Sequence, residues 1–206
     1  MIKIIDYGMG NVKSVANMLR KAGHDFQIVS DPLTIKKAEK IILPGVGAFD
    51  AGMKLLKSSG IYDVLNRCVL VDKIPILGIC LGMQLLARMS EEGKEVGLSW
   101  IDADVKRFDF SQSDQSLKVP HMGWNYVLSQ NENSNLFATI HQPMRFYFVH
   151  SYHFVCNDHE DVLATAHYGY DFTCAVCKEN IYGVQFHPEK SHKYGLQLLK
   201  NFLELC

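Results

Sequence analysis

The sequence predicts an α/β protein of three layers, in which helices cover both faces of a mixed, mainly parallel central sheet. Up to Met89, short apolar strands alternate with amphipathic helices, a pattern typical of parallel sheets. From Trp100 onward, short strands are joined by polar turns, and a last helix is expected over residues 193–205. No internal repeat or linker divides the 206 residues, so we expect one domain over residues 1–206.

The composition is that of an ordinary globular protein, with 48% hydrophobic and 21% charged residues. A formal net charge of −1 provides no attraction for nucleic acid or an anionic membrane, so neither is expected as a partner. No apolar run is as long as a membrane span, and residues 1–6 lack the layout of a secretion signal. The six cysteines show no disulfide spacing, so we expect reduced thiols and a cytoplasmic protein.

The first half of the chain is expected to contain four strands, each an apolar run that ends in a turn. The strands are expected at residues 2–6, 26–29 and 41–43 and in the run that begins at Pro75. Helices are expected in the segment that ends at Ala22 and at residues 49–57, 61–71 and 83–90. Gly8 and Gly10 suggest a dinucleotide site, but Lys13 replaces the third glycine of that fingerprint. We therefore expect a tight connection there and no cofactor.

The second half is expected to be rich in short strands. They are expected at residues 105–110, 126–128, 145–149, 153–156, 164–168, 174–177 and 181–186. A polar segment at residues 111–116 is expected to form an exposed, mobile loop. Cys174 and Cys177 lie three residues apart on one strand and therefore point to opposite faces, so we expect them in the core and predict no metal site.

Cys80 lies in a Gly-x-Cys-x-Gly turn between a strand and a helix. Gly78 and Gly82 have no Cβ atom, so the backbone can turn sharply around the thiol. This is the arrangement of a nucleophile elbow, with sulfur in place of a serine hydroxyl and a helix beginning beside it. The alternative is a buried structural cysteine, which is the more common fate of a lone Cys.

A thiol nucleophile needs a base, and the base needs a group that orients it. His187 ends a predicted strand, and Glu189 follows two residues later, so the carboxylate can fold back onto one ring nitrogen while the other faces the thiol. Residues 44–47 end another strand with Gly45 and Gly47, whose flexible peptides can direct N–H groups at an anion. This segment is a candidate oxyanion strand.

Residues 44–47, 78–84 and 185–191 resemble the three signatures of class I (triad) glutamine amidotransferases, which share a three-layer, flavodoxin-like fold. Within that family, residues 4–11 and 118–125 resemble the glutaminase subunits of imidazole glycerol phosphate synthases. The resemblance implies that Cys80 attacks the glutamine amide, that His187 transfers protons and that Glu189 orients His187. It also implies that backbone N–H groups hold the oxyanion. These groups belong to Leu81 and to the region of Val46 and Gly47.

The resemblance further implies a substrate, L-glutamine, and a partner that consumes ammonia. The positions that match glutamine-binding residues are Gln84, Ser151 and Tyr152. The implied partner is a (β/α)8 cyclase subunit, which would form a heterodimer with this chain. The positions that match its docking face are Asn11, Met122, Trp124 and Lys190. The resemblance also implies a glutaminase that is nearly silent alone and becomes active when the partner holds its ligand. Our hypothesis for this activation is a rotation of the peptide between Gly45 and Val46 that turns its N–H into a donor for the oxyanion.

Alternatives remain at this stage. Some relatives of this glutaminase supply ammonia to sugar amidotransferases of bacterial surface polysaccharides, and residues 100–110 resemble that branch as well. Trp124 could be a core aromatic residue instead of an interface residue. A cysteine peptidase or deglycase of the same broad fold would share the elbow Cys and a histidine, but would not need Gln84. A binding module without activity would not be expected to keep nucleophile, base and acid.

Overall fold

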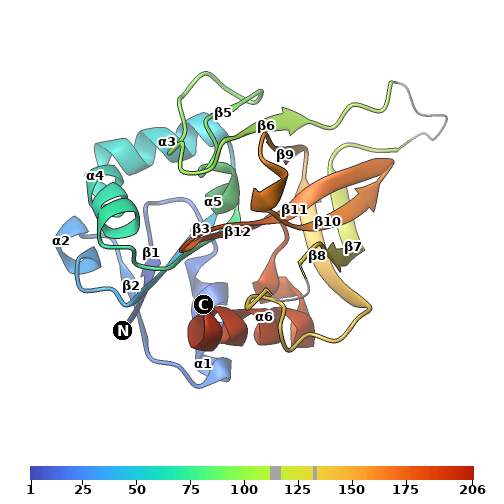
Figure 1. Ribbon diagram of the computed structural model, residues 1–206. Helices are drawn as coiled ribbons and strands as arrows, with labels where there is room; N and C mark the ends of the chain where they lie inside the picture. Colours follow the sequence, from blue (N-terminus) through green and yellow to red (C-terminus); the bar gives the residue numbers. More distant parts are fainter. Residues whose placement is uncertain (112–116, 132–133) are drawn as a thin grey trace.

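The computed structural model describes residues 1–111, 117–131 and 134–206. Its strands join into one sheet whose main path runs in the order β2, β1, β3, β4, β12, β11, β10, β7 and β8 (Figure 1). The first five strands on this path are mutually parallel: β2 (Phe26–Val29), β1 (Ile2–Ile5), β3 (Lys40–Gly45), β4 (Ile76–Cys80) and β12 (Ile181–Val184). The sheet is therefore mixed and parallel in the half that contains Cys80.

The remaining strands pair mainly antiparallel. On the main path these are β11 (Tyr170–Lys178), β10 (Val162–Tyr168), β7 (His121–Ser129) and β8 (Met144–His150). A branch leaves β11 through β9 (Tyr152–Cys156), β6 (Ala103–Arg107) and β5 (Met89–Ser90), of which β5 and β6 are parallel. This half supplies the wall of the candidate site that faces the parallel strands.

Helices cover both faces of the parallel strands, which confirms the three layers. One face carries α1 (Val12–Ala22) and α6 (His192–Leu205), and the other carries α2 (Pro32–Ile35), α3 (Phe49–Ser58), α4 (Ile61–Asn66), the π-helical turn η1 (Arg67–Val71) and α5 (Leu81–Gln84) (Figure 1). Two short 3-10 turns complete the structure, η2 (His159–Asp161) and η3 (Pro188–Lys190). Ile4 packs toward α1 and α6 whereas Ile5 packs toward α3, because successive strand residues face opposite sides.

The helix expected at residues 83–90 is wrong in extent. The helix begins at Leu81 and ends at Gln84, and residues 89–90 form strand β5. The carbonyl oxygens of the next residues, Leu85, Leu86 and Ala87, accept hydrogen bonds from the backbone N–H groups of residues 98–100. A continued helix would need those carbonyls for its own hydrogen bonds, so pairing with a distant segment ends it.

Other boundaries also differ from the expected ones. The helix expected at residues 61–71 divides into α4 and η1, the strand expected at residues 105–110 is β6, which ends at Arg107, and the short strand expected at residues 126–128 is the longer β7. Of the polar segment 111–116, residues 112–116 lie outside the described residues.

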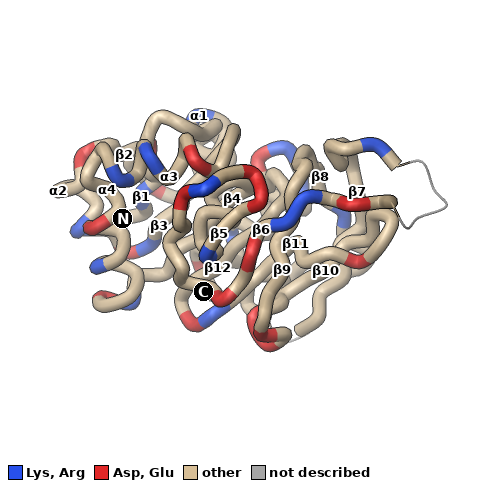
Figure 2. The backbone as a smooth tube through the Cα atoms, turned by 90° about the horizontal axis from the view of Figure 1, so that it is seen from above, with Lys and Arg blue, Asp and Glu red and all other residues tan. Residues whose placement is uncertain are grey.

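The described helices are each too short or too polar to cross a membrane. All six cysteines are free thiols. Basic and acidic residues are distributed over the whole backbone trace (Figure 2), in agreement with the nearly neutral formal charge.

Candidate active site

The turn around Cys80 is as sharp as the two glycines predict. Cys80 ends strand β4 with φ 54° and ψ −112°, a conformation that residues with a side chain rarely adopt. A Cβ atom on Gly82 would lie 1.8 Å from the carbonyl oxygen of Leu43, and one on Gly78 would lie 2.6 Å from the carbonyl oxygen of Gly82. Both positions therefore require glycine. Because α5 has only one turn, its dipole at the sulfur is small.

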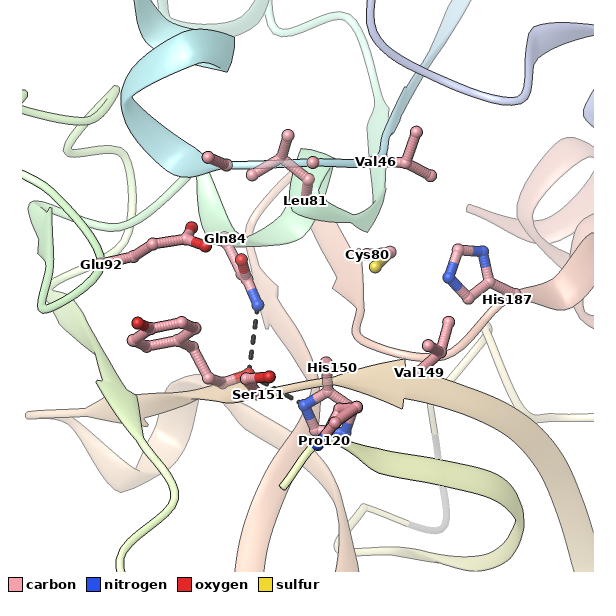
Figure 3. Close-up of a pocket in the computed structure, with 13 residues that line it drawn as sticks. Val46, Cys80, Leu81, Gln84, Glu92, Pro120, Val149, His150, Ser151 and His187 are labelled. Atoms are coloured by element: carbon pink, nitrogen blue, oxygen red, sulfur yellow. Dashed lines mark hydrogen bonds between the residues drawn. The ribbon is translucent and has the colours of Figure 1, made fainter. Parts of the chain in front are cut away.

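His187 and Glu189 form a buried pair beside the sulfur. The Nδ1 atom of His187 lies 2.8 Å from Oε1 of Glu189, and the two side chains are 3% and 2% exposed. Nε2 of His187 is buried without a regular hydrogen bond. Figure 3 shows Cys80 and the His187 ring side by side at the cavity that both residues line. The structure thus brings the Cys80 sulfur, the His187 imidazole and the Glu189 carboxylate together in that order.

Two opposing effects set the pKa of His187. Burial lowers it, because the charged imidazolium loses its hydration. Interactions with the Cys80 sulfur and with the Glu189 carboxylate outweigh burial and raise the pKa to about 10. At neutral pH the imidazole therefore holds a proton between a sulfur and a carboxylate, which is the arrangement needed for proton transfer to a leaving group.

The Cys80 sulfur opens into a cavity of about 510 Å³, which is large enough for an amino acid. The expected residues that line it, besides Cys80 and His187, are Val46, Gly47, Leu81, Gln84, Ser151 and Tyr152. They come from the loop after β3, from α5 and from the junction of β8 with β9 (Figure 3). Tertiary structure thus places the expected oxyanion and glutamine-binding residues around one sulfur, while Glu189 lies behind His187.

Two side-chain amides, linked in series by hydrogen bonds, support the Cys80 sulfur. Nε2 of Gln84 donates to Oε1 of Gln185 at 3.0 Å and to the carbonyl oxygen of Tyr152 at 3.1 Å. Nε2 of Gln185 in turn donates to the sulfur of Cys80 at 3.7 Å. Gln185 was not expected as a site residue, although it belongs to the motif that contains His187. Its side chain is fully buried, so its amide is held firmly beside the Cys80 sulfur.

The comparisons with known proteins agree with this geometry. A sequence model of the family described as glutamine amidotransferase class-I matches residues 3–206. The chain belongs to this family. It is 54% identical to imidazole glycerol phosphate synthase subunit HisH of Leptospira borgpetersenii, over 100% of both chains. It is 53% identical to subunit HisH 2 of Methanococcus maripaludis, over 99% of both chains, and 45% identical to subunit HisH 1 of that organism, over 100% of both. A solved glutamine amidotransferase structure has the same fold, with a TM-score of 0.76, 20% identity and coverage of 99% of this chain and 97% of that one.

Within this glutamine amidotransferase, Glu92 is a cavity residue that sequence reasoning missed. Its Oε2 atom accepts a hydrogen bond from the backbone N–H of Phe49 at 2.8 Å, at the start of α3. It therefore presents a fixed carboxylate to the cavity. Glu92 lies in an irregular turn without a recognisable motif, so no local signal distinguished it from the neighbouring acidic residues. Pro120, Val149 and His150 also line the cavity unexpectedly.

The residues expected to contact a partner lie at the surface near the cavity. Met122 and Trp124 are 62% and 42% exposed, so the alternative of Trp124 as a core residue is wrong. Trp124 stacks on His192, with parallel rings 5.5 Å apart. Asn11 is half-buried and caps α1, and Lys190 is exposed, with its Nζ atom 5.5 Å from the centre of the Tyr147 ring.

Strand β7 carries an apolar outer face, here called the β7 face. It consists of Met122, Trp124, Tyr126 and Leu128, which alternate along the strand and are all exposed. A row of large apolar side chains on one strand face is unusual for a surface and is typical of protein–protein contacts. Because Pro120 at the entry to β7 lines the cavity, this face begins beside the candidate site.

Proposed function

We propose that this chain is the glutaminase subunit of an imidazole glycerol phosphate synthase. It hydrolyses L-glutamine to glutamate and ammonia and passes the ammonia to a cyclase that makes imidazole glycerol phosphate and AICAR in histidine biosynthesis. The observation that carries the proposal is the placement of His187 between the Cys80 sulfur and the Glu189 carboxylate. The similarity to HisH subunits over the whole chain supports the choice of pathway.

In the first half of the reaction, the Cys80 sulfur attacks the side-chain amide carbon of glutamine. The carbonyl oxygen becomes an oxyanion, which backbone N–H groups of Leu81 and of the loop at Val46 and Gly47 stabilise. The C–N bond then breaks, and Nε2 of His187 gives its proton to the departing nitrogen, so that ammonia leaves. The γ-glutamyl group remains on sulfur as a thioester.

In the second half, water attacks the thioester carbon. His187, now neutral, takes a proton from this water, and the bond between carbon and sulfur breaks to release glutamate. Glu189 accepts from Nδ1 throughout, which holds the ring in one orientation and stabilises its charged form.

The cavity also contains groups suited to the amino-acid end of glutamine. Glu92 presents a carboxylate that can pair with the substrate ammonium. Ser151 and Tyr152 lie at the junction of β8 and β9, and Gln84 adjoins them, so we propose that these three residues hold the rest of the amino-acid end.

We propose that the partner docks on the β7 face, together with Asn11 and Lys190, and that it is a (β/α)8 cyclase. Released ammonia would take up a proton in water and stop being a nucleophile, so a partner beside the cavity is needed to receive it. The apolar β7 face begins at that cavity. Six free thiols are consistent with the reducing cytoplasm that we propose as its location.

A second acceptor is favoured by one specific observation. The chain resembles HisH 2 of Methanococcus maripaludis more than HisH 1 of the same organism, at 53% against 45% identity. A duplicated glutaminase subunit is free to serve a second acceptor, and the candidate is a sugar amidotransferase of surface polysaccharide biosynthesis.

The experiment measures product formation by the purified chain with each acceptor, from glutamine and from ammonium. With the correct acceptor, Cys80→Ala should reduce the rate of synthesis from glutamine by about 1,000-fold or more, while synthesis from ammonium continues at its usual rate. Undiminished glutamine hydrolysis by Cys80→Ala would overturn the glutaminase assignment. Coupling to the sugar amidotransferase alone would replace the histidine pathway by the second acceptor.

A further inference from the structure

Two buried histidines beside the cavity have no part in the proposed chemistry. His150 lines the cavity at the end of β8, and His121 begins the neighbouring strand β7. They are 6% and 4% exposed, and the two strands pair them directly. Nδ1 of His121 lies 3.0 Å from Nε2 of His150. Two imidazoles this close must have defined proton positions, because one nitrogen has to donate and the other has to accept.

The proton positions follow from the neighbouring groups. Nδ1 of His150 lies 2.8 Å from the carbonyl oxygen of Tyr152, which can only accept, so Nδ1 carries the hydrogen (Figure 3). Burial lowers the pKa of His150 to about 3, so the ring is neutral and its Nε2 must accept. Nδ1 of His121 is therefore the donor between the two rings.

His121 is neutral for the same reason, since burial lowers its pKa to about 4. Its Nε2 must then accept, and the group available is the side-chain Nδ2 of Asn125 at 3.2 Å. The orientation of that amide is fixed independently. Nδ2 also donates to the carbonyl oxygen of His167 at 2.8 Å, and Oδ1 accepts from the backbone N–H of Tyr126 at 2.8 Å. The hydrogen bonds from Asn125 through His121 and His150 to the carbonyl oxygen of Tyr152 thus all run in one direction.

The series reaches the nucleophile at its other end. The carbonyl oxygen of Tyr152 accepts a second hydrogen bond, from Gln84, which also donates to Gln185. Gln185 donates to the Cys80 sulfur. A continuous set of hydrogen bonds therefore connects strand β7 to the sulfur through buried and half-buried groups. The low polarity around the buried ones strengthens each bond and makes a broken one costly.

Strand β7 presents this series on one side and the β7 face on the other. His121 and Asn125 point inward, whereas Met122, Trp124 and Tyr126 alternate with them and are exposed. A partner that seats on the outer side chains presses on the same backbone that holds the inner ones. A shift of β7 along or across β8 changes the distance between the rings of His121 and His150.

We propose that His121 and His150 are positioning residues, which transmit the docking of a partner on strand β7 to Gln84, Gln185 and Cys80. The proposal rests on the proposed function. It assigns to the two imidazoles a role in partner-dependent activation of the glutaminase, in addition to any contribution to folding.

The first test compares His121→Leu with His121→Asn, because the two side chains have nearly the same shape and Asn can place a donor where Nδ1 lies. The readout is the ratio of glutaminase kcat with the partner cyclase to kcat without it, with the KM for glutamine measured alongside. The ratio for the unaltered protein is measured first. If the unaltered protein hydrolyses no glutamine, either with or without the cyclase, that result rejects the proposed glutaminase function itself. If it is active, we expect His121→Leu to reduce the ratio at least tenfold and His121→Asn to keep it within threefold. Equal ratios in all three proteins would overturn the inference.

The second test needs no substitution and therefore does not depend on whether a variant folds. Nitrogen-15 NMR of the full chain at pH 7 distinguishes the two neutral forms of each histidine ring. Both His121 and His150 should carry hydrogen on Nδ1, and addition of the partner should move their ring signals while those of exposed His159 stay in place. Hydrogen on Nε2 of either ring, or ring signals that do not respond to a partner that stimulates activity, would contradict the proposed role.

Discussion

Gly45 and Cys80 occupy directly paired positions on the neighbouring parallel strands β3 and β4. A Cβ atom on Gly45 would lie 2.6 Å from the Tyr7 hydroxyl oxygen and 2.7 Å from the backbone nitrogen of Gly82. The segment that holds Val46 and Gly47 can therefore lie beside the nucleophile only because Gly45 has no side chain. This pairing brings the expected oxyanion loop to the sulfur and makes the glycines of both strands essential.

Gly82→Ala should destabilise the protein strongly, because the added methyl would overlap the carbonyl of Leu43 and no flexible side chain can yield. We expect a loss of roughly 4 kcal/mol or more in the free energy of unfolding. The matched control is Gly23→Ala, which has open space and only the strain of φ 84°, about 1 kcal/mol. Urea unfolding measures both, and similar losses would show that the elbow tolerates a side chain.

Glu189→Gln should reduce kcat about 100-fold or more, because it removes the charge that stabilises protonated His187. The pKa of His187 is raised to about 10, so activity that needs its proton should fall only near that pH. Without the carboxylate this alkaline limb should move to lower pH. The pH profile of glutaminase activity checks this prediction, with Glu204→Gln as control, since exposed Glu204 pairs with half-buried His24. An unmoved limb would exclude the role given to Glu189.

Glu92→Gln should raise the KM for glutamine by about 10- to 100-fold, because it removes the carboxylate proposed to pair with the substrate ammonium. The amide oxygen can still accept from the N–H of Phe49, so the loop should keep its position. Initial rates over a range of glutamine concentrations measure the effect. Glu95→Gln is the control, because Glu95 pairs with Lys57 away from the cavity. A normal KM in Glu92→Gln would place the ammonium elsewhere.

Trp124→Ser should weaken partner binding tenfold or more, because an aromatic residue on an apolar face typically provides much of the binding free energy. The melting temperature of the isolated chain should change little, since the side chain is 42% exposed. Leu33→Ser is the control, because Leu33 is an exposed apolar residue on α2. Calorimetric titration with the cyclase measures the affinity, and equal losses in both variants would argue against the β7 face.

The buried histidines should make the protein less stable in mild acid. His121 and His150 have folded-state pKa values of about 4 and about 3, below the ordinary 6.5, so below pH 6.5 the unfolded chain binds protons that the folded chain does not. Each contributes a loss of about 1.4 kcal/mol per pH unit below that value. The contribution of His187 has the opposite sign. It is fully present below pH 6.5 and is lost as the pH rises toward about 10.

Urea unfolding at pH 7, 6 and 5 tests this dependence. His121→Asn should lose stability with falling pH less steeply than the unaltered protein, by about 1 kcal/mol per pH unit. Exposed His159→Asn should keep the original slope. Identical slopes in all three proteins would show that His121 takes up its proton without unfolding.

Much of the site was predictable because it lies in local patterns. The glycines around Cys80 predict the sharp turn at its sulfur. The position of Glu189 two residues after His187 predicts the hydrogen bond between their side chains. The helix after the elbow was not predictable in the same way. Its residues have helical periodicity, but pairing of their carbonyls with residues 98–100 ends it after one turn.

The sequence by itself therefore determined the alternation of strands and helices, the elbow at Cys80 and the placement of Glu189 beside His187, because these depend on neighbours within a few residues. Only the tertiary structure decided that Glu92 lines the cavity, that Gln185 donates to the Cys80 sulfur and that a hydrogen bond joins His121 to His150. Those contacts join segments that lie far apart in the chain, and local propensity carries no information about which distant groups will satisfy a buried donor or acceptor.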